Sequence, residues 1–481
     1  MNTVHDTVVQ TPPAPTKDIV TRGLQQAMKP RQLVMMSLGG AIGAGLFVGS
    51  GAGIAVAGPA VLVSFLIAGF LVVLVMRMMG EMVAADPDSG AFSVHAEKAM
   101  GPIAGRTIGW LYWVQVVIVV AAEATAAAAI TAASIPAVPQ WAAALFYMSV
   151  LTAVNLAGVS RFGEFEFWFA ALKIAAIVGF LGIGSAMIFG WIPSFDAPAL
   201  ANLTGHGGFA PNGVTGIAAG LLIVVFAFGG TEVMAIAAAE TSEPRRNVRR
   251  AVRSIVWRIL VFYIGSVLIM VTVLPWTAEE LSSGPFVAVL NAAHVPGAGA
   301  VMTVVVVIAL LSSLNAMLFS GSRMIYSLSE RGAAARIFGR VSSNGVPRLA
   351  VLASVTFGFL TVVLNYLAPD RVLPLLLNAV GSTILVLWTF VTVSQIVLRR
   401  RAEKEGRNDL PLKMWGFPYL SYVALALLAA VAVLALFDDA ARNQLIATLT
   451  FTCAITLACW VLGRRQRRTS GDVKAAAESA H

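Results

Sequence analysis

Three ionisable residues lie within long apolar stretches of the sequence, where a charged side chain is energetically costly. Glu123 stands in AAEATAAAA, Lys173 in FEFWFAALKIAAI and Glu232 in FAFGGTE. Charged groups at such depth in a membrane segment mark substrate sites or proton pathways. A buried lysine can also load and release a proton during a reaction cycle. The three residues are therefore candidates for proton or ligand chemistry.

Each of these residues also has a structural interpretation. Lys173 lies about 14 Å from the cytoplasmic end of its segment at 1.5 Å per residue, where it either carries a proton or hydrogen-bonds freed carbonyls of an interrupted first helix. Glu232 either acts in gating or coupling, which we favour, or caps unwound backbone amides. Glu123 either contacts a substrate amine or bonds to a neighbouring helix. Glu81 and Glu240 stand at segment ends, and we expect each to pair with a nearby arginine.

Two glycine clusters interrupt segments that would otherwise form continuous helices: LGGAIGAGLF, in the run from Gly39 to Gly53, and FAFGGTE. Unwinding a helix frees N–H groups that attract a carboxylate and C=O groups that attract a protonated amine. The alternative for one segment alone is close helix packing through Gly-xxx-Gly spacing. Two interruptions at matching positions favour a substrate site between discontinuous helices. We interpret Gly49 to Gly53 as close packing only.

Composition places the chain in the membrane. Of its 481 residues, 58% are hydrophobic and 12% are charged, with a mean hydropathy of +0.82. A soluble chain carries about 25% charged residues. The net charge of +9 comes from basic loops between apolar runs, which membrane topology explains better than nucleic-acid binding. The histidines are scattered, Cys453 and Cys459 point to different helix faces, and we expect no metal, disulfide or cofactor.

The apolar runs predict an all-α integral membrane protein with twelve transmembrane helices. Lysine and arginine concentrate in alternate loops, which places both termini in the cytoplasm. The expected location is the cell's inner (plasma) membrane. The interrupted segments 1 and 6 are an odd number apart and cross in opposite directions, as in inverted five-helix repeats. The expected segments are 33–58, 59–84, 106–134, 141–160, 164–190, 215–240, 254–275, 298–328, 347–367, 372–398, 416–437 and 444–463.

The predicted organisation therefore has four parts. A disordered cytoplasmic tail comprises residues 1–30, and the transporter core of helices 1–10 comprises residues 31–400 as two inverted repeats. Helices 11 and 12 occupy 401–463, and a second cytoplasmic tail runs over 464–481.

The stretches GGAIGAGLF, FAFGGTE and FEFWFAALKIAAI resemble those of bacterial amino acid permeases of the amino acid–polyamine–organocation (APC) superfamily. MRMMGEM, DPDSGAFSVHAEKAMG and SRMIYSLSERG extend the resemblance over about residues 20–463. Within the family, TEVMAIAAAE, SIVWRILVFY and GGFAPNG are most similar to γ-aminobutyrate (GABA) permeases, although aromatic and proline permeases share much of the pattern. The resemblance implies a LeuT-like fold of inverted five-plus-five repeats, with helices 1 and 6 broken.

By this resemblance, the amides of Ala44 and Gly45 take the substrate carboxylate. The carbonyls of Ala41, Phe226 and Gly229 take the amine, and the Phe226 ring acts as a gate above the substrate. Many relatives carry a hydroxyl where this chain has Ala41 and Ala44. This departure from the family pattern predicts that a side-chain contact to the substrate carboxylate is missing here.

The resemblance also bears on coupling. Lys173 matches a lysine that occupies the place of a sodium ion in relatives, and Glu232 matches an acidic position implicated in coupling or gating. Ser312 and Ser313 could line a sodium site, but membrane-helix hydroxyls usually bond their own i−4 carbonyl, and a nearby lysine repels sodium. We therefore expect a proton-coupled symporter for a small zwitterionic amino acid, with GABA favoured.

Several alternatives to this expectation stay open or are disfavoured. An α-amino acid of aromatic, proline or alanine type is the second substrate candidate, and exchange is the alternative to symport. A membrane sensor is disfavoured by the short tails. An enzyme is disfavoured because no nucleophile–base or metal constellation appears.

Overall fold

The computed structural model describes residues 29–478, apart from 40–41, 194, 196–199, 239, 242, 370, 374–375, 377–381 and 408. Residues 1–28 of the predicted N-terminal tail, and Ala41, lie outside the described residues. Within the described part, seven helical stretches are long and apolar enough to cross a membrane. They are Gly49–Ala85, Pro102–Ser134, Phe162–Ile188, Ala298–Glu330, Arg348–Leu367, Thr383–Lys404 and Ala441–Arg464. Shorter apolar helices are Gln140–Leu156, Gly213–Val225, Val261–Val273 and Tyr419–Ala435.

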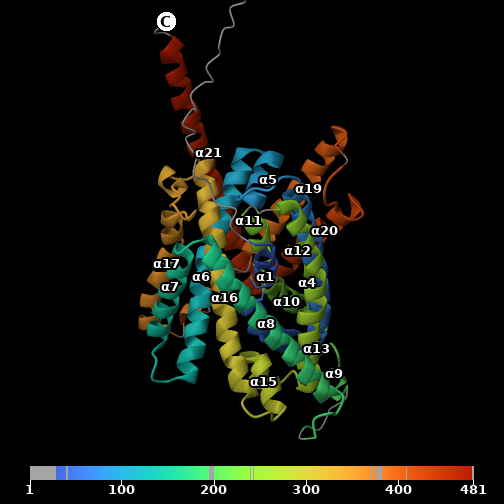
Figure 1. Ribbon diagram of the computed structural model, residues 1–481. Helices are drawn as coiled ribbons and strands as arrows, with labels where there is room; N and C mark the ends of the chain where they lie inside the picture. The colour runs from blue at the N-terminus through green and yellow to red at the C-terminus, as the bar shows by residue number, and fades with distance from the viewer. Residues whose placement is uncertain are drawn as a thin grey trace, which may run out of the picture.

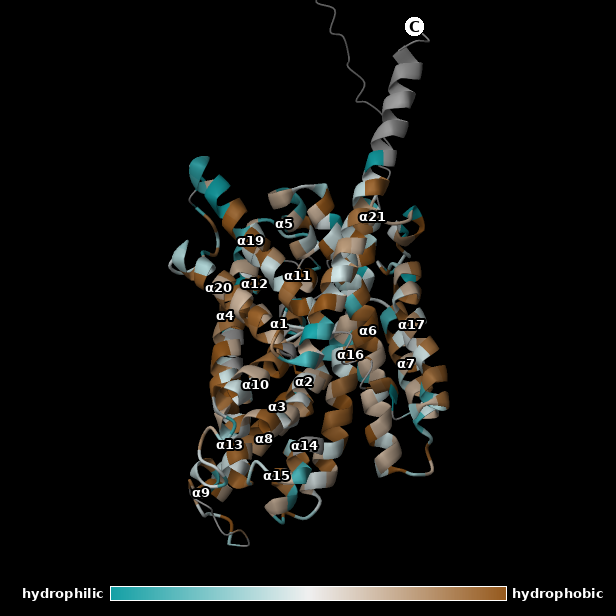
Figure 2. Ribbon diagram, turned by 180° about the vertical axis from the view of Figure 1, so that it is seen from behind, coloured by the Kyte–Doolittle hydropathy of each residue, from teal (hydrophilic) through white to brown (hydrophobic). Residues whose placement is uncertain are grey.

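The helices stand side by side in one bundle, with α5 at one end and α9 and α15 at the other (Figure 1). Apolar residues cover most of the middle of the bundle, and polar segments gather at the ends (Figure 2). A further polar stretch stands at mid-height, where α1, α2 and α16 are labelled (Figure 2). In the first half, the elements are α1 (Pro30–Gly39), α2 (Ala44–Phe47), α3 (Gly49–Ala57), α4 (Val61–Ala85), α5 (Ala91–Met100), α6 (Pro102–Ser134), α7 (Gln140–Leu156), α8 (Val159–Ile188) and α9 (Ala201–Thr204).

The second half of the chain continues the same bundle. Its helix α16 packs against both α6 and α8 and is central to the structure. The elements are α10 (Gly213–Ala227), α11 (Val233–Ala238), α12 (Pro244–Arg258), a π-helical turn (Ile259–Ile264), α13 (Gly265–Val273), α14 (Glu279–Ser283), α15 (Pro285–Ala292), α16 (Ala298–Glu330), α17 (Arg348–Leu367), α19 (Thr383–Lys404), α20 (Tyr419–Ala435) and α21 (Asp439–Glu478).

Both glycine clusters coincide with helix interruptions. The first helix stops at Gly39 and resumes at Ala44, and the extended backbone of Gly43 has φ −134° and ψ −150°. The second interruption separates α10 from α11, and there Gly230 adopts a φ of +93° that favours glycine. The packing of α10 against α2 and α3 brings the two interrupted helices together.

A buried ion pair ties α16 to the chain that follows α11. Arg323 Nε donates to Glu240 Oε1 at 2.7 Å, and both side chains are 1% exposed. The guanidinium also lies 3.8 Å from the centre of the Phe319 ring. Glu81 is also buried, and its Oε2 lies 3.9 Å from Nη1 of Arg399. The predicted arginine partners of Glu240 and Glu81 are confirmed.

Removing one member of the Arg323–Glu240 pair is expected to destabilise the protein strongly. Arg323→Met leaves the Glu240 carboxylate buried without its cation, which costs about 3–5 kcal/mol. The double variant Arg323→Met, Glu240→Gln should recover most of this loss, whereas Arg246→Ala, in an exposed pair with Glu243, should have little effect. Thermal unfolding of the detergent-purified protein measures all three. Equal stability of Arg323→Met and wild type would contradict the prediction.

The short helix α5 is held against its neighbours by polar contacts. Ser93 Oγ donates to the carbonyl of Gly105 at 2.7 Å, and Arg331 Nη2 donates to Ser93 Oγ at 2.7 Å. His95 is 1% exposed, and its Nε2 has no hydrogen-bond partner among the described residues. Burial lowers the pKa of His95 from 6.5 to about 4. This histidine is therefore neutral in the folded protein at neutral pH.

Acidification is expected to destabilise the protein through His95. Below pH 6.5 His95 binds a proton in the unfolded chain, whereas in the folded chain it stays neutral down to about pH 4. The free energy of unfolding therefore decreases as the pH falls below 6.5. The loss between pH 7.5 and 5 should be about 2 kcal/mol. Melting temperatures of wild type and His95→Gln across this range check it. The variant should show the smaller decrease, and parallel curves would exclude His95 as the source.

Candidate functional site

The two helix interruptions touch through a glycine. A Cβ built on Gly45 would lie 2.4 Å from the Cα of Ala227 and 2.9 Å from its carbonyl oxygen. A side chain at this position would therefore collide with backbone atoms, which cannot rotate away. At Gly43, a Cβ would lie 2.7 Å from Ser313 Oγ and 2.8 Å from Glu123 Oε1. Glycine at both positions lets the first interruption approach α10 and α16 closely.

A small cavity of about 30 Å³ lies between the interruptions. This is the space of about one or two water molecules. Its walls include the backbone of both interruptions and the side chains of Glu123, Gln115 and Ser313. Of the expected substrate contacts, Ala44, Gly45, Gly229 and Glu123 all line this cavity. Ala41 and the side chain of Phe226 lie outside the described residues.

Glu123 lies on α6, and its side chain contacts α16 and the first helix interruption beside the cavity. Its Oε1 accepts a hydrogen bond from Ser313 Oγ of α16 at 2.9 Å and lies 3.5 Å from the amide nitrogen of Ala44. Its Oε2 is buried and has no hydrogen-bond partner among the described residues. The side chain thus bonds to a neighbouring helix, as one of the two interpretations expected, while it also faces the cavity.

Lys173 reaches the first interruption from α8. It is 0% exposed, and its Nζ donates to the carbonyl oxygen of Ile42 at 3.0 Å. This is the contact that the structural interpretation of Lys173 requires, since Ile42 lies where the helix is interrupted. Lys173 also interacts electrostatically with Glu166 and Glu123. A role in coupling stays a prediction.

Glu166 is a further buried carboxylate, which was not among the residues predicted from sequence. Its side chain is 0% exposed; Oε1 accepts from Ser312 Oγ at 2.6 Å and Oε2 from Asn315 Nδ2 at 3.1 Å. Its spacing from Lys173, seven residues or two helical turns, places both on one face of α8 and was the signal that could have revealed it. Ser312 and Ser313 both donate to carboxylates, so the expectation that they bond their own helix carbonyls was wrong.

Glu232 closes the second interruption. Its Oε2 accepts from the amide of Gly230 at 3.1 Å and lies 3.5 Å from Thr231 Oγ1. Its Oε1 is buried without a hydrogen-bond partner among the described residues. The carboxylate therefore caps unwound backbone, the alternative that we disfavoured, and gating or coupling by Glu232 stays a prediction.

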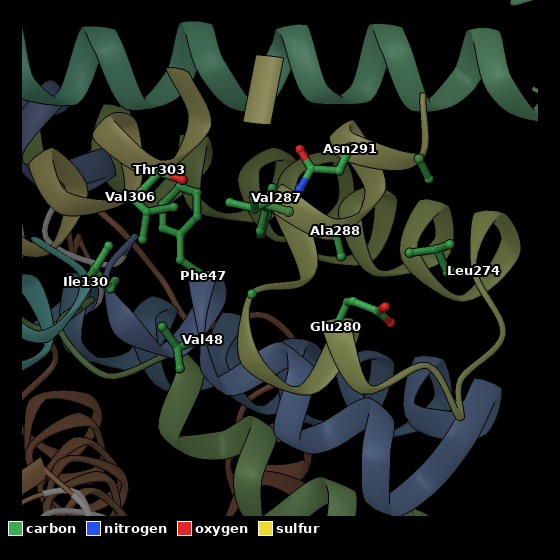
Figure 3. A pocket seen from close by; sticks show the side chains of 13 residues that line it. Phe47, Val48, Ile130, Leu274, Glu280, Val287, Ala288, Asn291, Thr303 and Val306 are labelled. Carbon is green, nitrogen blue, oxygen red and sulfur yellow. The ribbon is translucent and has the colours of Figure 1, made fainter. Parts of the chain in front are cut away.

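A larger cavity of about 530 Å³ lies beside α14 and α15 (Figure 3). Phe47 and Val48 form part of its wall, so it begins two residues after Gly45 along the first interrupted helix. The Phe47 ring lies 4.8 Å from that of Phe286. Glu280 supplies the carboxylate among the labelled side chains in Figure 3.

Comparison with known proteins identifies the family. The family model described as "Amino acid permease" matches residues 32–469. The chain belongs to the amino acid permease family. This permease is therefore a multi-pass membrane protein and a transporter, not an enzyme, and its substrate is an amino acid. The resemblance inferred from the glycine and lysine stretches is confirmed.

The similar permeases are named for two different substrate classes, gamma-aminobutyric acid and aromatic amino acids. The chain is 44% identical to the gamma-aminobutyric acid permease of Bacillus subtilis over 444 residues, 92% of this chain and 95% of that protein. It is 46% identical to the aromatic amino acid transport protein AroP of Corynebacterium glutamicum over 427 residues, 88% and 92% of the two chains. The gamma-aminobutyric acid permease of Escherichia coli is 40% identical over 422 residues, 88% and 90% of the two chains.

Proposed function

We propose that this permease imports a small zwitterionic amino acid by proton-coupled symport. GABA is the favoured substrate, and an α-amino acid of aromatic, proline or alanine type is the alternative. The observation that carries the proposal is the meeting of two helix interruptions at one buried cavity, where Gly45 lies against Ala227. Such a junction offers backbone N–H groups to a carboxylate and backbone C=O groups to an amine.

The proposed architecture has twelve spans in the LeuT-like arrangement, with both termini in the cytoplasm and the protein in the inner membrane. Helices 1–10, in residues 31–400, form two inverted repeats, and 401–463 supplies helices 11 and 12. Seven long and four shorter apolar stretches among the described residues support this architecture, as do interruptions at corresponding positions.

Each end of the substrate has proposed contacts. The amides of Ala44 and Gly45 bind the carboxylate, and the carbonyls of Ala41, Phe226 and Gly229 bind the amine. The positions of Ala44, Gly45 and Gly229 around the cavity support these contacts. Because an amino acid is several times larger than a water molecule, a cavity of about 30 Å³ must widen to admit it. Movement of the interrupted helices is therefore part of the proposed transport cycle.

Protons are favoured over sodium as the coupling ion. The Lys173 ammonium group donates to the Ile42 carbonyl at the first interruption. Its positive charge would repel a sodium ion bound nearby. The hydroxyls of Ser312 and Ser313 donate to carboxylates. Lys173 and Glu232 are the proposed coupling or gating residues, since both are buried charges at the interruptions.

Uptake into proteoliposomes tests the proposal. Labelled GABA and a panel of aromatic, proline-type and small α-amino acids are offered with an imposed pH gradient, with a sodium gradient and with neither. We expect accumulation of one substrate class under the pH gradient alone. Accumulation that follows the sodium gradient, or that requires amino acid inside the vesicles, would contradict proton symport and indicate sodium coupling or exchange.

A further inference from the structure

The Glu123 carboxylate stands at the place that the proposed function gives to the substrate carboxylate. Its Oε1 lies 3.5 Å from the amide nitrogen of Ala44. It is also close to the Gly43 backbone, since a Cβ added to Gly43 would lie 2.8 Å from this oxygen. Two acidic groups would thus share one set of backbone amides. Both cannot occupy this place while ionised.

The surroundings of Glu123 do not neutralise a second negative charge. From α16, Ser313 offers one hydroxyl, and from α10 to α11 the cavity wall is the backbone of Ala227, Gly229 and Gly230. Among the described residues, the charged group that acts on Glu123 is Lys173 of α8, and this lysine also interacts with Glu166. When two carboxylates share a buried site, one of them stays protonated.

A protonated Glu123 would help to bind the substrate. Its Oε2 is buried and has no partner among the described residues, and the side chain is 6% exposed on the cavity wall. The nearby Gln115, also 6% exposed, has an Oε1 without a partner in the described part of the chain. These unsatisfied polar atoms point to a ligand with hydrogen-bonding groups. A neutral carboxylic acid can donate its O–H to a substrate carboxylate, whereas an ionised one repels it.

We propose that Glu123 carries the coupled proton, because the substrate carboxylate binds only when Glu123 is protonated. The inference rests on the proposed symport. A proton from outside neutralises Glu123, and the substrate carboxylate then takes the amides of the first interruption. After the substrate leaves on the inside, Glu123 releases its proton there and its carboxylate returns to Ala44 and Ser313. In this scheme Lys173 contributes to coupling by position, since its bond holds the Ile42 carbonyl, and Glu123 is the group that carries the proton.

The test is the variant Glu123→Gln, which keeps the shape and the neutral charge of the protonated acid. In proteoliposomes it should still exchange internal for external substrate but should not accumulate substrate under a pH gradient. Its substrate affinity should change less than twofold between pH 5.5 and 8. Wild-type affinity should weaken by up to about tenfold per pH unit at the upper end. Glu403→Gln removes an exposed acid of α19 and should behave as wild type.

Two outcomes count against the inference, and a third counts against the proposed function on which it rests. Accumulation by Glu123→Gln under a pH gradient would show that another group carries the proton. A folded Glu123→Gln that binds no substrate would show that the ionised carboxylate itself is needed, as for an amine contact. If the wild type accumulates no amino acid under a pH gradient, the proposed function fails rather than the role of Glu123.

A second variant keeps the inference testable if Glu123→Gln does not fold. Ser313→Ala removes the hydroxyl that donates to the ionised carboxylate at 2.9 Å. The pH at which half of the wild-type binding is lost should then move upward. An unchanged pH profile for a folded Ser313→Ala would overturn the proposed role of Glu123.

Discussion

Replacing Gly45 by alanine is expected to reduce transport strongly, whereas the same replacement at Gly49 is expected to preserve it. An alanine Cβ at residue 45 would lie 2.4 Å from the Cα of Ala227, so α2 and α10 must separate. Overpacking of this kind costs about 1–3 kcal/mol, and each 1.4 kcal/mol lost from binding weakens affinity about tenfold. A Cβ at residue 49 would meet the nearest atom, the Ala44 carbonyl oxygen, at 3.8 Å.

Substrate binding to the purified protein and uptake into proteoliposomes measure this prediction together. Gly49→Ala should also raise the melting temperature slightly, since alanine favours a helix over glycine by about 1 kcal/mol. Wild-type affinity in Gly45→Ala would show that the contact between the interruptions does not shape the substrate site.

Replacing Lys173 by methionine is expected to cause the largest loss of stability at the site. Methionine keeps much of the side-chain volume but leaves the Ile42 carbonyl without the Lys173 donor and Glu166 without the positive charge of Lys173 that acts on it. An uncompensated buried carboxylate costs about 3–5 kcal/mol. Low yield, a lowered melting temperature and loss of uptake are the expected results.

The double variant Lys173→Met, Glu166→Gln separates stability from coupling. It removes the unpaired negative charge, so folding should recover although the bond to Ile42 stays absent. If this variant folds and still accumulates substrate under a pH gradient, Lys173 is a structural cation. If it folds and only exchanges substrate, a charge at Lys173 or Glu166 is needed for coupling. Stability no better than that of Lys173→Met would show that the unpaired Glu166 charge is not the cause of the loss.

The helix interruptions could be predicted from sequence because their cause is local. Glycine weakens a helix wherever it stands, and two clusters at matching depth indicated which helices are discontinuous. The burial of Glu123, Lys173 and Glu232 was equally predictable, since a charged residue within an apolar run can be recognised from sequence alone. The arginine partners of Glu81 and Glu240 followed from their positions at segment ends.

The partners of the buried side chains could not be predicted in the same way. A helix that is apolar on all sides has no stripe of hydrophobic residues to show which face meets which neighbour. The hydrogen bonds from Ser312 to Glu166 and from Ser313 to Glu123 depend on how α16 is rotated about its own axis. Glu166 was missed because it stands near the expected start of its segment, where acidic residues are common.

Which glycines after the first interruption are closely packed could also be determined only from the structure. The prediction of close packing holds at Gly53, where an added Cβ would lie 3.2 Å from Val61 Cγ2, but not at Gly49, which has room. Gly-xxx-Gly spacing describes the face of a helix and not whether another helix lies against it.

The tight cavity between the interruptions has a kinetic consequence. A space of about 30 Å³ does not receive an amino acid by simple diffusion into a ready-made pocket. If the helices at the proposed site part before the substrate enters, the rate of opening limits the association rate at high substrate concentration. A short and a long substrate should then associate at the same maximal rate and differ in how long they stay bound. Selectivity in this permease would be expressed as residence time.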